Sequence, residues 1–242
     1  MELTAAHEKC SDCPIRFRAV CARCQPDELA RLERIKYYRT YEAGQPVMWS
    51  GDEMTFVASV VRGMARLNQT LPDGRTQVVG LLMPSDFLGR PGRQRLSYDV
   101  TAISELTLCC FRRKPFEALL AETPHLVDRL LVLSLDELDA ARDWMLLLGR
   151  KTAREKIASL LTIIARRAGE GGRPAAPPLV IELALTREMM ADYLGLTVET
   201  ISRQISALRT EGLIVLRGSR RVLVPDLPRL IAETGDQAGR TI

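Results

Sequence analysis

Four of the chain's six cysteines lie near the N-terminus, in the stretch HEKCSDCPIRFRAVCARCQ. They are Cys10, Cys13, Cys21 and Cys24. Four thiolates can hold a zinc ion or a [4Fe–4S] cluster, and cysteine pairs can also close disulfides. The seven residues between the two pairs are fewer than the roughly 12–20 that are common in zinc motifs. The stretch therefore predicts thiolate chemistry, but it matches a local zinc site poorly.

The other two cysteines, Cys109 and Cys110, are adjacent in the stretch LTLCCFRRKPFEALL. The ligands of an iron–sulfur cluster need not be consecutive, so three N-terminal thiols can combine with a distant fourth. If this stretch is a strand, neighbouring side chains point to opposite faces, and only one of the two thiols can face a given site. The residues alone leave open a local or a distributed set of ligands, and Cys109 or Cys110 as the distant one.

Composition limits the kinds of protein this can be. A chain of 242 residues that is 46% hydrophobic is long enough for two domains with a real core. We expect no membrane span, because no run of about 18 apolar residues is free of charges. The start MELTAAHEKC lacks the features of a signal peptide, so we expect a cytoplasmic protein, where structural disulfides are rare. From residue 150 onward, 15 Lys and Arg against 10 Asp and Glu give a net +5, which suits contact with nucleic acid.

Residues 32–111 are expected to form strands. Short apolar runs alternate there with glycine-marked turns, and Asp73-Gly74 lies between two alternating runs, as in a hairpin turn. Many short strands at close spacing predict a sandwich or a barrel-like roll.

A long helix is expected next, over residues 123–149. Thr123 and Pro124 suit an N-cap and the first helical position. One helix face is spaced alternately by four and three residues, and it consists of Leu131, Leu135, Leu138, Arg142 and Met145. Such a face either belongs to the core or forms a coiled-coil-like dimer contact. The Gly- and Pro-rich residues 166–178 predict an exposed loop.

Residues 185–214 predict a helix-turn-helix. Thr186 can cap the first helix, Gly195 allows the left-handed turn that ends it, and Thr197 can cap the second helix. The spacing of Ala191, Gly195 and Ile201 is that expected of a DNA-binding helix-turn-helix. Apolar residues give the second helix a stripe that we expect to be buried: Val198, Ile201, Ile205 and Leu208. Two strand-like runs around the basic residues 217–221 predict a wing.

The polar face of the second helix begins with Glu199, Ser202 and Arg203. In a major groove, Arg can donate to guanine O6 and N7, and Glu can accept from cytosine N4. The alternative is a solvated face with a Glu199–Arg203 pair that contributes about 0.2–0.5 kcal/mol. The helix-turn-helix and the basic wing favour DNA contact.

This α+β layout resembles the cyclic-AMP receptor/FNR superfamily of bacterial transcription regulators, and nearly the whole chain is covered. LGLTVETISRQ (residues 194–204) is similar to the recognition helix of the FNR branch, and in particular of its FnrL/FnrP-like members. The resemblance implies a cyclic-nucleotide-binding-like β-roll, a long dimerisation helix and a C-terminal winged helix-turn-helix. We expect a cysteine segment at 1–25, the roll at 26–122, the helix at 123–149, the DNA-binding domain at 150–230 and a tail at 231–242.

The resemblance also implies an oxygen-responsive, non-enzymatic regulator with a [4Fe–4S] cluster on Cys10, Cys13, Cys21 and Cys109. Cys24 would be a spare that could replace Cys21. The implied partners are a second copy of the chain, a TTGA-type palindrome in double-stranded DNA, and RNA polymerase, for which the 71–77 hairpin is a candidate contact. The residues implied to contact DNA are Thr197, Glu199, Thr200, Ser202 and Arg203, and the dimer would use the helix face that begins at Leu131.

One departure argues against a cyclic nucleotide ligand. Cyclic-nucleotide binders carry Gly-Glu and a later Arg-Ser/Thr, whereas Gly89 is followed by Arg90 in SDFLGRPGRQRLSYDVTA, and the second pair is missing. A second hypothesis is a zinc-stapled regulator that responds to a small ligand in the roll. An enzyme has little support, because neither His7 nor His125, the only histidines, lies in a nucleophile–base pattern.

Overall fold

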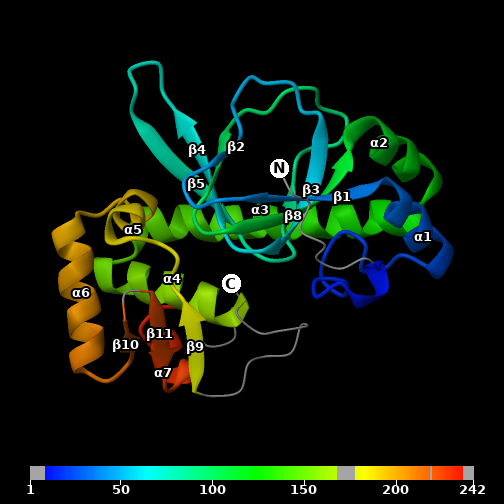
Figure 1. Ribbon diagram of the computed structural model, residues 1–242. Helices are drawn as coiled ribbons and strands as arrows, with labels where there is room; N and C mark the ends of the chain where they lie inside the picture. Colours follow the sequence, from blue (N-terminus) through cyan, green and yellow to red (C-terminus); the bar gives the residue numbers. More distant parts are fainter. Residues whose placement is uncertain (1–8, 168–177, 219, 237–242) are drawn as a thin grey trace. The chain divides into compact units, whose positions relative to one another are not determined.

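The computed structural model of the protein describes residues 9–167, 178–218 and 220–236. The chain divides into two compact units between Asp136 and Glu137, within the long helix α3 (Pro124–Arg150). Each unit is built around its own sheets and helices (Figure 1).

The first unit contains a roll of two four-stranded antiparallel sheets. One sheet has the order β1 (Lys36–Tyr41), β8 (Leu106–Arg112), β3 (Phe56–Arg62) and β6 (Phe87–Leu88). The other has the order β2 (Pro46–Met48), β7 (Asp99–Ala102), β4 (Ala65–Thr70) and β5 (Thr76–Leu82). The predicted hairpin turn joins β4 to β5, and Gly74 there has a φ of 87°, which glycine adopts without steric cost. The predicted roll is confirmed.

Two helices flank the roll, and one of them corrects the predicted start of the strands. Residues 32–35 belong to α1 (Pro26–Ile35) rather than to a strand. Gln25 and Glu28 form a capping box and Pro26 occupies the first turn, so two consistent signals mark the start of the helix. Helix α2 (Arg113–Glu122) follows β8 directly.

Helix α3 confirms the predicted long helix, but its N-terminus differs from the expectation. With 27 residues it is about 40 Å long. The hydroxyl of Thr123 is buried and has no hydrogen-bond partner, so it does not cap the helix. The carbonyl of Thr123 still accepts from the amide of Leu126 at 3.1 Å, while its side chain is buried. At the other end the helix continues through Gly149 to Arg150.

The second unit confirms the winged helix-turn-helix. Helix α4 (Ala153–Arg167) precedes α5 (Arg187–Leu194) and α6 (Val198–Thr210), and α7 (Leu227–Ala232) ends the unit. A three-stranded sheet has the order β10 (Val215–Arg217), β11 (Arg221–Val224) and β9 (Leu179–Glu182). Arg166 and Arg167 belong to the last turn of α4, so the loop predicted over 166–178 is wrong for these two residues, and residues 168–177 lie outside the described part of the chain. No helix among the described residues is both long enough and apolar enough to cross a membrane.

Candidate cluster site and nucleic-acid interface

Residues 9–24, called the cysteine segment below, form short turns rather than a regular element. A 3-10 turn (Cys10–Asp12) begins it, and successive amide-to-carbonyl hydrogen bonds three or four residues apart continue it. The guanidinium of Arg16 donates to the carbonyl of Cys21 at 2.6 Å and to that of Cys24 at 3.0 Å. Arg16 therefore folds the segment back on itself and brings its two cysteine pairs close together.

The cysteine segment and the roll enclose a cavity of about 20 Å³. Three thiols of the segment line it, from Cys10, Cys13 and Cys21, together with the thiol of Cys109 on β8. The rest of the wall is formed by Ile15, Ala19, Val20, Leu32, Tyr38, Ser59 and Phe111. These four cysteines are the four predicted ligands. The remaining two, Cys24 and Cys110, are buried in the core and are not part of this wall.

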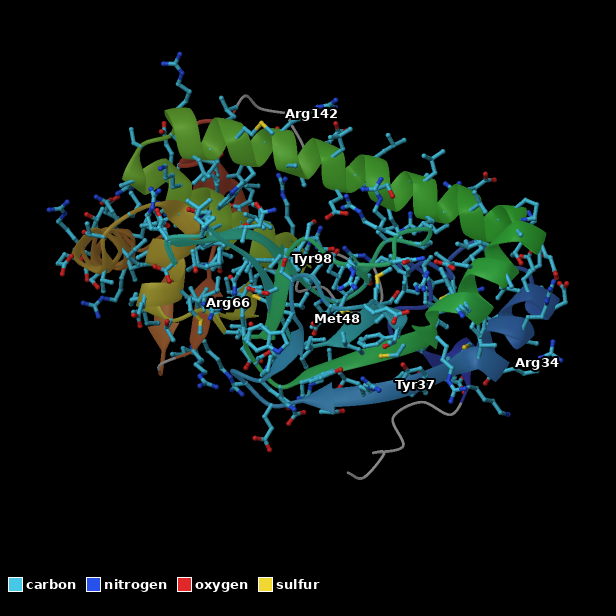
Figure 2. The ribbon with its side chains drawn as sticks, turned by 90° about the horizontal axis from the view of Figure 1, so that it is seen from above. Arg34, Tyr37, Met48, Arg66, Tyr98 and Arg142 are labelled. Carbon is cyan, nitrogen blue, oxygen red and sulfur yellow. The ribbon has the colours of Figure 1, made fainter. Side chains whose placement is uncertain are left out.

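Strand pairing explains why Cys109 and not Cys110 faces the cavity. Strand β8 lies between β1 and β3, and Cys109 is directly opposite Tyr38 on one side and Ser59 on the other. Cys110 is opposite Tyr37, which Figure 2 labels on β1, and it is completely buried. Because side chains alternate along a strand, these two neighbouring thiols belong to different faces of one sheet.

The thiols of the cavity are protonated at neutral pH when nothing is bound. Burial raises the pKa of Cys21 to about 11, and it raises the pKa of Cys10 and Cys13 and, strongly, that of Cys109. Lys36 beside Cys10 and Arg16 beside Cys21 act in the opposite direction and favour thiolates. Binding of a thiophilic metal group would therefore release protons, and two nearby cations would offset part of its negative charge.

The donor set fits an iron–sulfur cluster in number, chemistry and surroundings. Four cysteines line one cavity whose other side chains are mostly apolar, and a [4Fe–4S] cluster is held by four cysteine thiolates. Within the described ranges, no three His, Cys, Asp or Glu side chains already stand close enough to hold a metal ion. The cavity has room for about one water molecule. A cluster therefore needs the cysteine segment to move outward from β8.

Side chains of the first turns of α3 hold the cysteine segment and α1. The guanidinium of Arg129 donates to the carbonyl of Ala19 at 3.3 Å and also to the carbonyl of Arg18. One turn earlier, Nδ1 of His125 lies 3.0 Å from Oε1 of Glu28. The beginning of α3 is thus in direct contact with the segment that carries three of the four thiols.

The predicted helix face on α3 does not belong to the core of the single chain. Its exposed fractions are 58% for Leu131, 52% for Leu135, 45% for Leu138 and 71% for Met145. Arg142, labelled on α3 in Figure 2, is also exposed and pairs with Asp139 at 2.9 Å. A row of exposed apolar side chains at alternating spacings of four and three has the pattern of a coiled-coil seam.

The helix-turn-helix is positioned by the caps that the sequence predicted. The hydroxyl of Thr186 accepts from the amide of Met189, Gly195 ends α5 in the left-handed region, and the hydroxyl of Thr197 accepts from the amide of Thr200 at 3.2 Å. The buried stripe of α6 consists of Ile201, Ile205 and Leu208. Val198 is 41% exposed, so its predicted place in that stripe is wrong; at the first position of α6 it points away from the core.

The exposed face of α6 carries the predicted reading residues. Glu199, Ser202 and Arg203 are exposed, and no ion pair joins Glu199 to Arg203 in this described helix. Backbone hydrogen bonding at the helix N-terminus and the hydroxyl of Thr197 lower the pKa of Glu199. The Thr197 and Thr200 hydroxyls lie 3.1 Å apart. Exposed charged and polar groups therefore gather at the N-terminal end of α6, the end that enters a groove in DNA-binding helix-turn-helix proteins.

The wing adds positive charge to the second unit. β10 and β11 pair as an antiparallel hairpin, and Arg217, Arg220 and Arg221 are exposed at or beside its tip. Arg154 on α4 clamps the C-terminal ends of α6 and α7 together, because it donates to Glu211 at 2.9 Å and to Glu233 at 2.6 Å. This clamp was missed by sequence reasoning, since its three residues are far apart in the chain.

Comparison with known proteins gives the same two parts. The Crp-like helix-turn-helix domain matches residues 155–233, and the cyclic nucleotide-binding domain matches residues 38–123. The chain is 64% identical to the transcriptional activator protein FnrL of Cereibacter sphaeroides over 98% of this chain and 96% of that protein. It is 40% identical to a probable transcriptional activator of Rhizobium leguminosarum, over 91% of each chain. The solved structure of FixK2 from Bradyrhizobium japonicum is similar with a TM-score of 0.75 and 29% identity, over 84% of this chain and 100% of that one.

A β-roll followed by a long helix and a winged helix-turn-helix defines a DNA-binding transcription regulator, not an enzyme. The identity to FnrL over almost the full length of both proteins shows that the chain belongs to the CRP/FNR family of regulators.

Proposed function

We propose that this protein is an oxygen-responsive transcription activator whose DNA-binding homodimer is stabilised by a [4Fe–4S] cluster on Cys10, Cys13, Cys21 and Cys109. The observation that carries the proposal is the single cavity that these four thiols line. Cys24 is buried away from that wall, which supports its role as the spare cysteine. The similarity to a protein named as a transcriptional activator supports activation.

When bound, a cluster of this kind supplies iron–thiolate bonds that are lost on exposure to oxygen. The chain's own contribution is to fasten the cysteine segment to β8, because three thiolates come from the segment and one from Cys109. Without those bonds, the segment is held by the packing of Ile15 and Val20 in the core and by hydrogen bonds such as those that Arg129 donates to two of its carbonyls. The position of the segment against α3 thus becomes dependent on thiolate ligation.

Dimerisation would use the exposed face of α3. Leu131, Leu135, Leu138, Arg142 and Met145 would pack against the same residues of a second copy. One chain carries one recognition helix, so the dimer contacts two half-sites about 34–36 Å apart. Arg203 would donate to guanine and Glu199 would accept from cytosine in the C·G pair of a TTGA-type half-site. Ser202 would contact the adjacent thymine, and Thr197 and Thr200 would lie at the entry of the groove. The β4–β5 hairpin is our candidate contact for RNA polymerase.

We further propose that the roll binds no cyclic nucleotide, despite its family. Gly89 has a φ of 108°, and a Cβ there would lie 2.9 Å from Cγ1 of Val57. Backbone conformation and packing therefore account for this glycine without a ligand. Arg90 follows where cyclic-nucleotide binders have a glutamate.

The test is anaerobic purification followed by an absorption spectrum, iron and sulfide analysis, and sedimentation with and without air. We expect a brown protein with about four iron and four sulfide per chain, dimeric before and mostly monomeric after exposure to air. A colourless protein with one tightly held zinc would overturn the cluster and support a zinc-stapled regulator that responds to a ligand in the roll.

A further inference from the structure

The hydroxyl of Ser59 is buried and has no hydrogen-bond partner. Ser59 is in the middle of β3, only 2% of it is exposed, and its Oγ contacts no donor or acceptor at hydrogen-bonding distance. An unsatisfied buried hydroxyl destabilises the folded state, because it has lost its hydrogen bonds to water without replacing them. Serine is a mostly exposed residue type, whereas its neighbours Ala58 and Val60 are apolar and completely buried. A hydroxyl at such a position calls for an explanation.

Ser59 lies next to the ligating thiol that comes from the roll. It is directly opposite Cys109 in the pairing of β3 with β8, and directly opposite side chains on one sheet face have Cβ atoms about 4.5–5.5 Å apart. Tyr38 occupies the corresponding place on the other side of Cys109. All three residues line the cavity that Cys10, Cys13 and Cys21 close from the opposite side. The hydroxyl therefore belongs to the wall of the proposed cluster site.

A water molecule would be a poor partner for this hydroxyl. The cavity has room for about one, but a buried water typically needs two to four polar partners. Besides Ser59, the wall supplies mainly apolar groups and cysteine sulfurs, which are weak hydrogen-bonding groups, and the hydroxyl of Tyr38 already interacts with Cys109. A metal-bound thiolate or an inorganic sulfide is a stronger acceptor because it carries negative charge, and a bound metal–sulfur group would supply such sulfurs.

We propose that Ser59 donates its hydroxyl proton in a hydrogen bond to a sulfur of the bound cluster, either the Cys109 thiolate or an adjacent sulfide, and thereby slows loss of the cluster. This inference rests on the proposed function. Hydrogen bonds to cluster sulfurs are among the factors that set the properties of iron–sulfur sites. The same hydroxyl is unfavourable in the empty protein and favourable in the loaded one.

The test therefore has two readouts: removal of the hydroxyl should make the apo-protein more stable and the bound cluster less stable. Ser59→Ala removes an unsatisfied group from the apo-protein, so we expect its unfolding temperature to rise by about 2–4 °C. In the anaerobically loaded protein we expect iron release to a chelator to be about tenfold faster, at the lower end of the effect of groups that support metal ligands. Ser59→Thr keeps the hydroxyl and should release iron at nearly the wild-type rate.

Thr162→Val is the matched control, because the hydroxyl of Thr162 is also buried and without a partner, on α4 of the second unit. It should stabilise the apo-protein without changing iron release. Unchanged iron release in a loaded Ser59→Ala variant would overturn the assignment of Ser59 and leave the proposed function intact. A wild-type chain without iron and sulfide would overturn both.

Discussion

Arg129 is the residue through which we expect ligation of the cysteine segment to influence dimerisation. Its guanidinium makes two hydrogen bonds to segment carbonyls, and hydrogen bonds to a charged group contribute about 1.5–3 kcal/mol each. One of the two is long, and Arg129 is only half-buried. We therefore expect Arg129→Met, which keeps most of the apolar stem, to cost about 1–3 kcal/mol in total.

That energy sets the largest change in dimerisation that the contact can transmit. For the loaded protein, measured without oxygen by sedimentation equilibrium, we therefore expect the dimer dissociation constant to rise above that of the wild type, by at most about 5–150-fold, at unchanged iron content. The matched control is Arg31→Met, which removes the exposed ion pair of α1 with Glu122 on α2 but no contact of the segment. Dimerisation of Arg129→Met equal to that of the wild type, or equal weakening by Arg31→Met, would refute a specific role of Arg129.

Three other predictions concern the ligands, the DNA and pH. Cys109→Ala should abolish iron binding, whereas Cys110→Ala should retain iron and instead lower the unfolding temperature; iron analysis after anaerobic purification decides between the two strand faces. Arg203→Ala should weaken binding to the palindrome by about 1–3 kcal/mol and relax the preference at one base pair, as measured by competition with substituted sites; uniform weakening on all sequences would show a phosphate contact. Glu28 raises the pKa of His125 above 6.5, and His125 lowers the pKa of Glu28 below 4.5. The stabilisation by this pair is therefore complete between pH 4.5 and pH 6.5. It is lost as the pH rises through the raised pKa of His125 or falls through the lowered pKa of Glu28. His125→Gln should remove this pH dependence from the measured free energy of unfolding.

The helix-turn-helix could be predicted in detail because its signals are local. Thr186, Gly195 and Thr197 act on amides three residues away or on their own backbone, so the sequence specifies the caps and the turn directly. The same reasoning was wrong for Thr123, whose hydroxyl points into the core. A residue with a high preference for the N-cap position therefore caps a helix only when packing does not bury its side chain in the core.

The cavity could be predicted only in part, because its walls depend on strand register. The alternation of side chains predicted that Cys109 and Cys110 face opposite ways, but the choice between them came from family resemblance. The residues alone could not choose, since that requires knowing where the cysteine segment packs. Ser59 and Tyr38 were not predicted, because each becomes a neighbour of Cys109 through pairing of strands about 50–70 positions apart in the chain.

The adjacent thiols of β8 also provide two internal reporters of motion. Cys109 is covered by the cysteine segment, so an alkylating reagent reaches it when that segment opens locally. Cys110 is within the core of the roll and becomes accessible only when the roll itself unfolds. Local and global opening differ in free energy, so the labelling rates of two consecutive residues separate release of the sensory segment from loss of the fold.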